Sequence, residues 1–244
     1  MSHGAYRLAG ALGLAAVAAL AGRRGSGTQG PMSAQQTANL KAKVRELFAS
    51  KDRANIQAAL ELWKALGGGE ALPLQRLELS WAKLSGADLT GADLTGADLT
   101  GANLRKANLT GADLTGTNLR LTNLWKANLI GADLTKAYLT KADLRLTNLW
   151  KANLEEADLT GANLRGAKLR GADLFRATLI GTDLREADLK ETDLTGAKLW
   201  EADLKGADLK GADLTEANLT GAKYNHTTVW PDGFRVPSVA VLVG

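Results

Sequence analysis

GADLTGADLTGADL, residues Gly86–Leu99, decides the fold, because it repeats the same five residues without interruption. Leucine occupies every fifth position from Leu74 to Leu219, thirty times in succession. Two residues before each of these positions, from Ala82 to Ala222, stands a small residue. The small residue is alanine except at Thr117, Thr122, Thr147, Thr182 and Thr192. The array therefore reads Ala-(Asp/Asn)-Leu followed by two variable residues.

A period of five residues matches neither the 3.6-residue period of a helix nor the sustained alternation of a long strand. Within one repeat, however, Ala-Asp-Leu alternates apolar, polar and apolar. A short extended segment would therefore point Ala and Leu inward and Asp outward, and the next two residues, often Gly, Lys or Glu, would turn the chain. Stacked coils bury a column of leucines that no single repeat can bury alone, so the pattern predicts an all-β solenoid.

On these residues the chain resembles the pentapeptide repeat family, whose signature is the A(D/N)LXX pattern of Gly86–Leu99. The resemblance covers residues 72–224. It implies a right-handed, four-sided β-helix of pentapeptide repeats with four repeats in each coil, the leucine and the small residue filling its interior. Backbone N–H groups pair between coils in such a fold, which agrees with the absence of proline from residues 74–230.

Both ends of a solenoid expose unpaired strand groups, so we expect a cap at each end. Residues 33–69 carry apolar side chains at helical spacing, with possible helix N-caps at Ser50 and Asp52 and a stop at Gly67–Gly69. This pattern predicts a short N-terminal helical hairpin that covers the first coil, with a partner-binding module as the alternative. Residues 225–244 are expected to form a C-terminal cap and a tail, whose apolar end, Val239–Val243, either adds an edge strand or binds another chain.

Residues 1–32 form a leader with two possible interpretations. An apolar run over residues 8–21 ends in Ala-Leu-Ala, which is typical of a secretory signal in residues 1–21. Arg23 and Arg24 follow directly, where positive charge disfavours translocation, and Met32 offers another start. We expect a disordered or misassigned leader and a cytoplasmic protein, with an exported or periplasmic protein as the alternative. A membrane association is expected only if the apolar segment is retained.

The composition argues against catalysis. The 244 residues include no Cys, and His3 and His226 are the only histidines, so thiolate chemistry is excluded and imidazole chemistry is nearly absent. A smooth, filled rod also offers few concavities in which catalytic groups converge. We therefore expect no enzyme and no catalytic, cofactor-binding or metal-binding residues.

With four repeats in a coil, the residue after each central leucine forms a column along the rod, here called the basic column. The column is a possible partner-binding face for phosphate, an acidic protein or a stacked base. The alternative is a solvated face balanced by an acidic one, since residues 82–224 hold nineteen Lys or Arg against twenty Asp or Glu. The members of the column are Ser85, Arg105, Trp125, Arg145, Arg165, Arg185 and Lys205.

A second column, here called the acidic column, holds carboxylates beside threonines. A row of carboxylates suggests calcium binding, but calcium requires roughly six to eight converging oxygens, which a straight column does not supply. The row of threonines suggests ice binding. Asp or Asn before the leucine is the family's default residue, whose side chain can bond nearby backbone, so we expect neither ligand. The column comprises Asp93, Asp113, Asp133, Asn153, Asp173, Asp193 and Asp213.

A second level of repetition weakens hypotheses that assign function to one flat face. LRLTNLWKANL occurs identically at Leu119–Leu129 and Leu144–Leu154, twenty-five residues apart. Twenty-five residues equal one coil plus one repeat, so duplicated aromatic residues move to the adjacent side in each step and do not stack. The aromatics at this spacing are Trp125, Trp150, Phe175 and Trp200.

Three functions remain open after these exclusions. A non-catalytic scaffold or protein–protein interaction protein, with an unidentified protein partner, fits every feature. The first alternative is a DNA mimic that binds a gyrase-type topoisomerase, as family members resembling quinolone-resistance proteins do. Those rods are strongly acidic and dimerise through a C-terminal helix, whereas this chain has a net charge of +4 and no such helix. The second alternative is a basic-face binder of an acidic partner or nucleic acid, and the mixed surface charge disfavours nucleic acid. The oligomeric state stays open.

Overall fold

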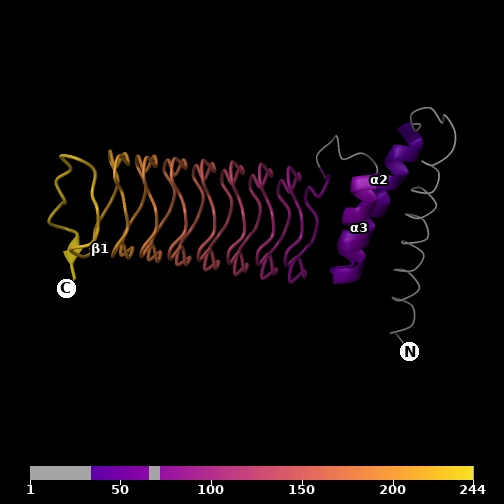
Figure 1. Ribbon diagram of the computed structural model, residues 1–244, viewed down its shortest axis with the longest axis horizontal. Helices are drawn as coiled ribbons and strands as arrows, with labels where there is room; N and C mark the ends of the chain where they lie inside the picture. The colour runs from indigo at the N-terminus through magenta and orange to yellow at the C-terminus, as the bar shows by residue number, and fades with distance from the viewer. Residues whose placement is uncertain (1–33, 66–71, 244) are drawn as a thin grey trace.

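The computed structural model describes residues 34–65 and 72–243. Helices α2 (Ala34–Ala49) and α3 (Arg53–Ala65) lie at one end of a rod of stacked coils (Figure 1). Two short strands, β1 (Lys223–Tyr224) and β2 (Val241–Leu242), lie at the other end. No helix within the described ranges is long and apolar enough to cross a membrane. The expectations for the leader, residues 1–32, and for a helix stop at Gly67–Gly69 lie outside the described residues.

Parallel bridges with a period of twenty residues stack the coils. From Pro73 to Asp203, each bridge joins the residue before a central leucine to the residue twenty positions later. The N–H of Asn103 donates to the Ala82 carbonyl at 2.9 Å, and the Leu84 N–H donates to the Asn103 carbonyl at 2.9 Å. The repeats thus form a β-helical solenoid with four repeats in each coil.

A tight turn separates each bridge from the next. The Ala107 N–H donates back to the Leu104 carbonyl at 2.9 Å, and the intervening Lys106 has φ +58°. Every corner repeats this left-handed residue, which glycine adopts freely and which costs other residues roughly 1–2 kcal/mol. Half of the corners nevertheless carry Lys, Glu, Arg, Leu or Trp, so the corners hold much of the variable surface.

The interior of the rod is uniform, as the sequence predicted. All thirty central leucines are buried, with no more than 7% of any side chain exposed. The small residues from Ala82 to Ala222 are buried as well, apart from the partly buried Ala217. At a threonine position, the Thr117 hydroxyl donates to the Leu94 carbonyl at 2.8 Å. Threonine therefore enters the core without leaving an unpaired polar group, whose burial would be destabilising.

The two helices pack against the first coil. The Arg45 guanidinium of α2 donates to the Pro73 carbonyl at 2.9 Å and to the Gln75 carbonyl at 3.0 Å. Between the helices, Asp52 caps α3 by accepting the Ala54 N–H at 2.9 Å, as the sequence indicated. Apolar side chains of both helices join the first coil in one buried cluster, which includes Val44, Leu47, Phe48, Ile56, Leu60, Leu72 and Leu74.

The proline in the first coil fits its place at the edge of the solenoid. Pro73 bridges Asp93, whose N–H donates to the Leu72 carbonyl at 2.9 Å and whose carbonyl accepts the Leu74 N–H at 2.8 Å. A bridge residue donates its own N–H to the preceding coil, and the first coil has no preceding coil. A proline at this position therefore removes a donor that would lack a ladder partner.

The coil register shifts by one residue near the C-terminus. Asp208 bridges Val229, twenty-one positions later, and the Thr228 hydroxyl donates to the Leu204 carbonyl at 3.0 Å from an inward position. The sequence pattern did not predict this shift, because the five-residue motif ends at Tyr224.

The apolar tail adds an edge strand, which was one of the two alternatives for Val239–Val243. Strand β2 pairs in parallel with β1, with Lys223 opposite Val241. Beside this pair, the Trp230 ring stacks on Phe234 with centroids 5.4 Å apart and meets Tyr224 edge-on at 5.5 Å. Three aromatic rings therefore pack together at the C-terminal end of the rod.

Candidate functional site

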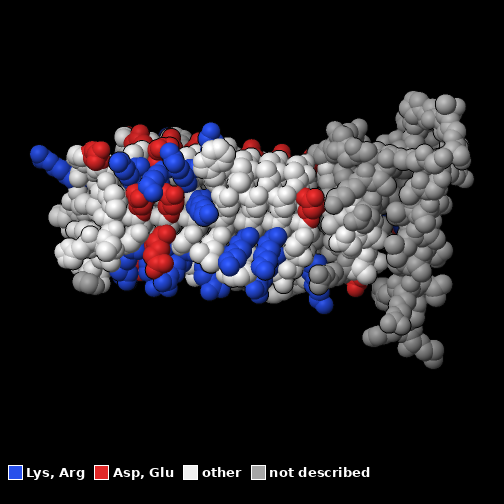
Figure 2. Space-filling model, viewed as in Figure 1, with Lys and Arg blue, Asp and Glu red and all other residues white. Residues whose placement is uncertain are grey.

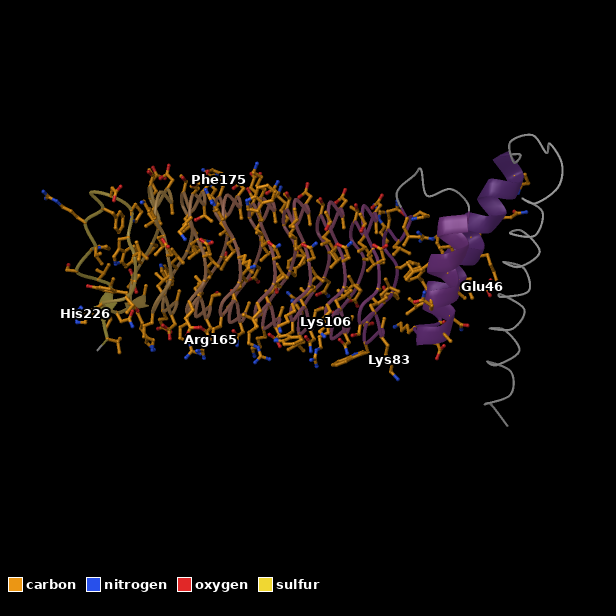
Figure 3. All side chains as sticks on the ribbon, in the orientation of Figure 1. Glu46, Lys83, Lys106, Arg165, Phe175 and His226 are labelled. Atoms are coloured by element: carbon orange, nitrogen blue, oxygen red, sulfur yellow. The ribbon has the colours of Figure 1, made fainter. Side chains whose placement is uncertain are left out.

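The structure brings the members of the basic column into line. Each lies two residues after a bridge residue, and these bridge residues pair in succession along the rod from Lys83 to Lys223. Figure 3 shows Lys83, Lys106 and Arg165 along one edge of the rod, with Phe175 on the opposite edge. The column is therefore a continuous feature, but its two halves differ in their charge partners.

The C-terminal half of the basic column is paired with carboxylates. Two of its arginines turn back to the aspartate two residues earlier, and both of these pairs are bidentate, with Nε donating to Oδ1 at 2.8 Å. The shortest distances in the four pairs are 2.7 Å for Arg145–Asp143, 2.7 Å for Arg165–Glu186, 2.6 Å for Arg185–Asp183 and 3.3 Å for Lys205–Asp203.

The two bidentate pairs lower the pKa of their aspartates. Hydrogen bonds from the Arg145 side chain hold the pKa of Asp143 below its ordinary value, against the opposing effect of partial burial. Partial burial also opposes ionisation of Asp183, but hydrogen bonds from Arg185 outweigh it, and the pKa of Asp183 is lowered. Cations in this half are thus neutralised locally, by carboxylates within or beside the same column and not by a separate acidic face.

The N-terminal half differs, and its charged part is here called the cationic cluster: Lys83, Arg105, Lys106, Trp125 and Lys126. All four cations are exposed, and none forms an ion pair with a carboxylate among the described residues. Three of them surround the half-buried Trp125 ring instead: from its centroid, the Arg105 Cζ lies at 4.2 Å, the Lys126 Nζ at 4.4 Å and the Lys106 Nζ at 5.9 Å. Because cations already surround this ring, it is a poor platform for a stacked base.

Two exposed apolar side chains lie at the preceding corner of the same coils. Trp81 is 69% exposed and Leu121 is 53% exposed. The Trp81 ring lies over the backbone of Gly101, its ring carbons 2.5 Å from the position that a Cβ would take there. The register of twenty residues places Gly101 between Trp81 and Leu121, so these three residues form an apolar corner.

Sequence reasoning missed this composite surface, although a signal was present. The bridge residues that follow the apolar corner are Lys83, itself a member of the cationic cluster, Asn103 and Asn123, and none is acidic. Farther along the same line of bridges, Asp143 is the first carboxylate. Three successive coils without an acidic bridge residue on this line distinguish the N-terminal half from the C-terminal half.

Figure 2 shows how charge is spread over the side of the rod turned to the viewer. Blue and red side chains alternate in the half near the C-terminus, while the half near the helices is mostly uncharged above its lower edge. Along that lower edge Lys and Arg predominate. The pairing of charges described above is therefore a property of one half of the rod.

The acidic column is explained by local hydrogen bonds. The Asp133 Oδ1 accepts the Thr135 N–H at 2.9 Å, and the Asp193 Oδ1 accepts the Thr195 N–H at 2.8 Å. Asn153 makes the same contact with the Glu155 N–H at 2.9 Å, so a carboxylate is not required for it. Within residues 34–65 and 72–243, no cluster of three or more His, Cys, Asp or Glu side chains could hold a metal ion.

A comparison with protein-family models identifies the repeats. The model described as pentapeptide repeats matches in eight copies, and the matched segments together span more than half of the chain. The matched residues are 78–116, 112–150, 139–174, 152–190, 172–211 and 187–223.

Solved structures of other pentapeptide repeat proteins are similar to the chain. HetL of the cyanobacterium Nostoc sp. strain PCC 7120, which is involved in heterocyst differentiation regulation, is 41% identical, with 62% of this chain and 76% of HetL covered and a TM-score of 0.31. QnrB1, a plasmid-mediated fluoroquinolone resistance protein, is 19% identical over 68% of this chain and 93% of its own, with a TM-score of 0.42. A protein of the Arabidopsis thaliana thylakoid lumen is 33% identical over 39% of this chain and 63% of its own, with a TM-score of 0.27. No curated protein matches the chain.

Proposed function

The chain belongs to the pentapeptide repeat family, and from this premise we propose that it is a non-catalytic scaffold or interaction protein that binds a protein partner. The observation that carries this proposal is the contrast between a filled interior and a varied exterior. The thirty central leucines are buried in the interior of the coils, so the outward bridge and corner residues are the ones available for recognition.

We propose the basic column as the partner-binding face. Its residues Arg105, Trp125, Arg145, Arg165, Arg185 and Lys205 lie in one line on a scaffold held by bridges in every coil. Cations on a stiff scaffold lose little conformational entropy on binding, and those of the column without an ion pair attract an acidic surface at long range.

Affinity capture with the full chain, followed by mass spectrometry, tests this proposal. The matched variants reverse charge either in the basic column, by Arg105→Glu with Arg165→Glu, or in the acidic column, by Asp113→Lys with Asp173→Lys. We expect a retained protein that is lost with the first variant and kept with the second. Recovery of no specific protein with the unmodified chain would contradict the proposed function.

The DNA-mimic alternative requires a negatively charged surface, whereas the proposed partner-binding face is positively charged. A mimic must present dense negative charge in place of the phosphates of duplex DNA, so that a basic groove accepts it. The basic column would be repelled by such a groove. We expect no inhibition of gyrase supercoiling at micromolar protein and no relief of quinolone inhibition. Inhibition that is lost on changing Asp93 and Asp213 would favour the mimic.

We propose that the coils form a right-handed, four-sided β-helix, closed at its N-terminal end by the hairpin within residues 33–69 and at its C-terminal end by residues 225–244. Four bridges in each coil, separated by left-handed corners, support four sides. The cluster that joins Phe48 of α2 to Leu74 of the first coil supports the cap. A crystal structure that showed the opposite hand, or helices detached from the first coil, would contradict this arrangement.

We propose a cytoplasmic location, with export as the alternative. The support comes from Arg23 and Arg24, which follow the apolar run directly. Cell fractionation with a C-terminal tag tests this choice. Recovery of a shortened chain outside the cytoplasm would establish a signal within residues 1–21.

A further inference from the structure

We propose that the cationic cluster and the apolar corner together dock an acidic segment of a partner protein, one that carries a large apolar side chain beside its carboxylates. The inference rests on the proposed function, because it assigns the partner's contact chemistry and a particular part of the basic column. It also narrows the face from the whole column to Lys83, Arg105, Lys106, Trp125 and Lys126, with Trp81 and Leu121 beside them.

The first step concerns charge. Four exposed cations of the cluster form no ion pair with a carboxylate among the described residues, whereas the four basic-column cations of the C-terminal half each form one. A partner's carboxylate that meets Lys106 or Lys126 gains a new pair and breaks none. A carboxylate that meets Arg185 must displace Asp183, with which the guanidinium forms two hydrogen bonds. The same acidic segment therefore binds the N-terminal half more favourably.

The second step concerns geometry around Trp125. Its ring has Arg105 and Lys126 close by, which holds two flexible side chains near one position. Long cationic side chains lose rotamer entropy when they bind, and side chains that are already held lose less. The indole thus holds the neighbouring cationic side chains in position, and it does not itself stack against the partner.

The third step concerns the apolar corner. Trp81 and Leu121 are among the most exposed large apolar side chains of the described residues, and they lie at the corner that precedes the bridge residues Lys83, Asn103 and Asn123. Burial of exposed apolar surface contributes about 25 cal/mol per Å², so a segment that covers this corner gains affinity that charge alone does not supply. Because the apolar corner lies beside the cationic cluster, a partner segment that contains both acidic and apolar side chains fits this surface.

The fourth step separates a protein segment from nucleic acid. The cluster extends over three coils, and at about 4.8 Å between paired strands it is roughly 10 Å long. Duplex DNA carries a charge for about every 1.7 Å of its length, so a longer phosphate track would extend past the cluster. There it would meet the pairs that Arg145, Arg185 and Lys205 form with aspartates, and a phosphate would have to displace a carboxylate from each of these cations. A short acidic protein segment fits within the cluster and avoids them.

The experiment measures binding of a short fluorescent peptide, in which glutamates alternate with leucines, to the full chain by anisotropy at low salt. The test variant is Lys106→Gln with Lys126→Gln. Its matched control, in the paired half but outside the basic column, is Lys136→Gln with Lys190→Gln, because both of these lysines already form ion pairs with carboxylates. A second matched pair tests the apolar corner, with Trp81→Ser against Trp200→Ser, which is also an exposed corner tryptophan. Circular dichroism melts verify that all four variants stay folded.

We expect the test variant to weaken peptide binding at least about tenfold, and its control to weaken it less than about twofold. Trp81→Ser should weaken binding about threefold or more, while Trp200→Ser should leave it unchanged. A peptide with glutamines in place of glutamates should bind at least about tenfold more weakly than the acidic peptide.

Several results would overturn the inference. The first is that the acidic peptide does not bind. The second is that the test variant and its control lose the same amount of peptide affinity. The third is that single-stranded or duplex DNA binds more tightly than the peptide and that the test variant abolishes this DNA binding. The last result would assign the cluster to nucleic acid. If the peptide fails while a captured protein still depends on Arg165 or another part of the rod, only this inference fails. If no specific protein is captured, the proposed function itself fails.

Discussion

The interior and the exterior of the rod follow different rules. Inside, every coil repeats the same leucines and small residues, and even the threonines keep their hydroxyls bonded. Outside, bridge and corner residues change from coil to coil, and one column contains both free and paired cations. Within the described coils, the interior therefore specifies the fold, whereas the differences between coils on the exterior allow a specific partner to be recognised.

The same comparison applies within the basic column. Arg105 and Arg185 hold equivalent positions, yet one packs over Trp125 and the other forms a bidentate pair with Asp183. Equivalent positions in a repeat thus do not imply equivalent chemistry. In this chain, the proposed binding surface lies where the cations of the basic column form no ion pair with a carboxylate.

The largest expected loss of stability comes from placing a residue type of the exterior in the buried interior of the rod. Leu149 is fully buried, so Leu149→Asp would place a carboxylate in a dry core without a partner. We expect destabilisation of at least about 4 kcal/mol and loss of the cooperative thermal transition measured by circular dichroism.

The matched exterior change is Asp113→Asn. The Asp113 Oδ1 accepts the Thr115 N–H at 2.9 Å, and Asn103 makes the equivalent bond to the Arg105 N–H, so the substitution keeps the contact. Its melting temperature should match that of the unmodified protein. Equal loss of structure in the two variants would show that the inward and outward assignments are wrong.

Removal of the helices should expose the interior from its end. Deletion of residues 1–66 uncovers Leu72 and Leu74 together with the free edge of the first coil, and such edges pair with other chains. We expect light scattering to show a marked rise in particle mass, because the uncovered chains associate. Deletion of residues 1–31 should leave the number of chains per particle as it is in the full-length protein. An unchanged association state after the longer deletion would mean that the helices do not serve as a cap.

Corner glycines offer a smaller test, in which two sites share backbone geometry and differ in their neighbours. Gly101 and Gly111 have φ of +64° and +62°, and a Cβ at Gly101 would meet the Trp81 ring while a Cβ at Gly111 would meet nothing within 4 Å. Gly111→Ala should cost about 1 kcal/mol. Gly101→Ala should cost more and shift the tryptophan fluorescence. Equal melting temperatures with unchanged fluorescence would place Trp81 elsewhere.

The smallest expected effect concerns paired and free cations. Arg145→Gln removes a bidentate pair with Asp143, so it should lower the melting temperature by about a degree or two at neutral pH, and Arg105→Gln should lower it less. Because the pairing lowers the pKa of Asp143, its contribution is present above the ordinary value of 3.8 and is lost as the pH falls below it. The two variants should therefore converge in acid. A difference that persists at low pH would exclude the ion pair as its cause.

Much of the fold could be predicted from the sequence because the repeat is unbroken. Thirty leucines in register fix which residues point inward, and no competing period exists over Leu74–Leu219. The shift at Asp208–Val229 could not be predicted, because it follows the last repeat, where no pattern restrains the chain. Strand β2 could not be assigned for a similar reason, since a short apolar tail fits either an edge strand or another chain.

The candidate site was predictable only as a column. Position in the repeat places Arg145 and Arg165 in line, but their partners depend on side-chain direction: Arg145 turns back to Asp143, while Arg165 reaches Glu186 in the next coil. Pairing across coils is a three-dimensional property that a linear pattern does not encode. The lack of acidic bridge residues near Lys83 was visible in the sequence. It marks the part of the basic column whose cations form no ion pair.

The most direct test uses the tryptophan side chains as reporters in one titration. Indole N–H signals in an NMR spectrum, assigned by substitution, report separately on Trp81 and Trp125 beside the free cations and on Trp150 and Trp200 elsewhere on the rod. On titration with the acidic, leucine-containing peptide, the signals of Trp81 and Trp125 should shift and saturate together, while those of Trp150 and Trp200 stay fixed. Shifts at Trp150 or Trp200 with Trp81 and Trp125 unmoved would contradict the claim that recognition lies at the cationic cluster and the apolar corner.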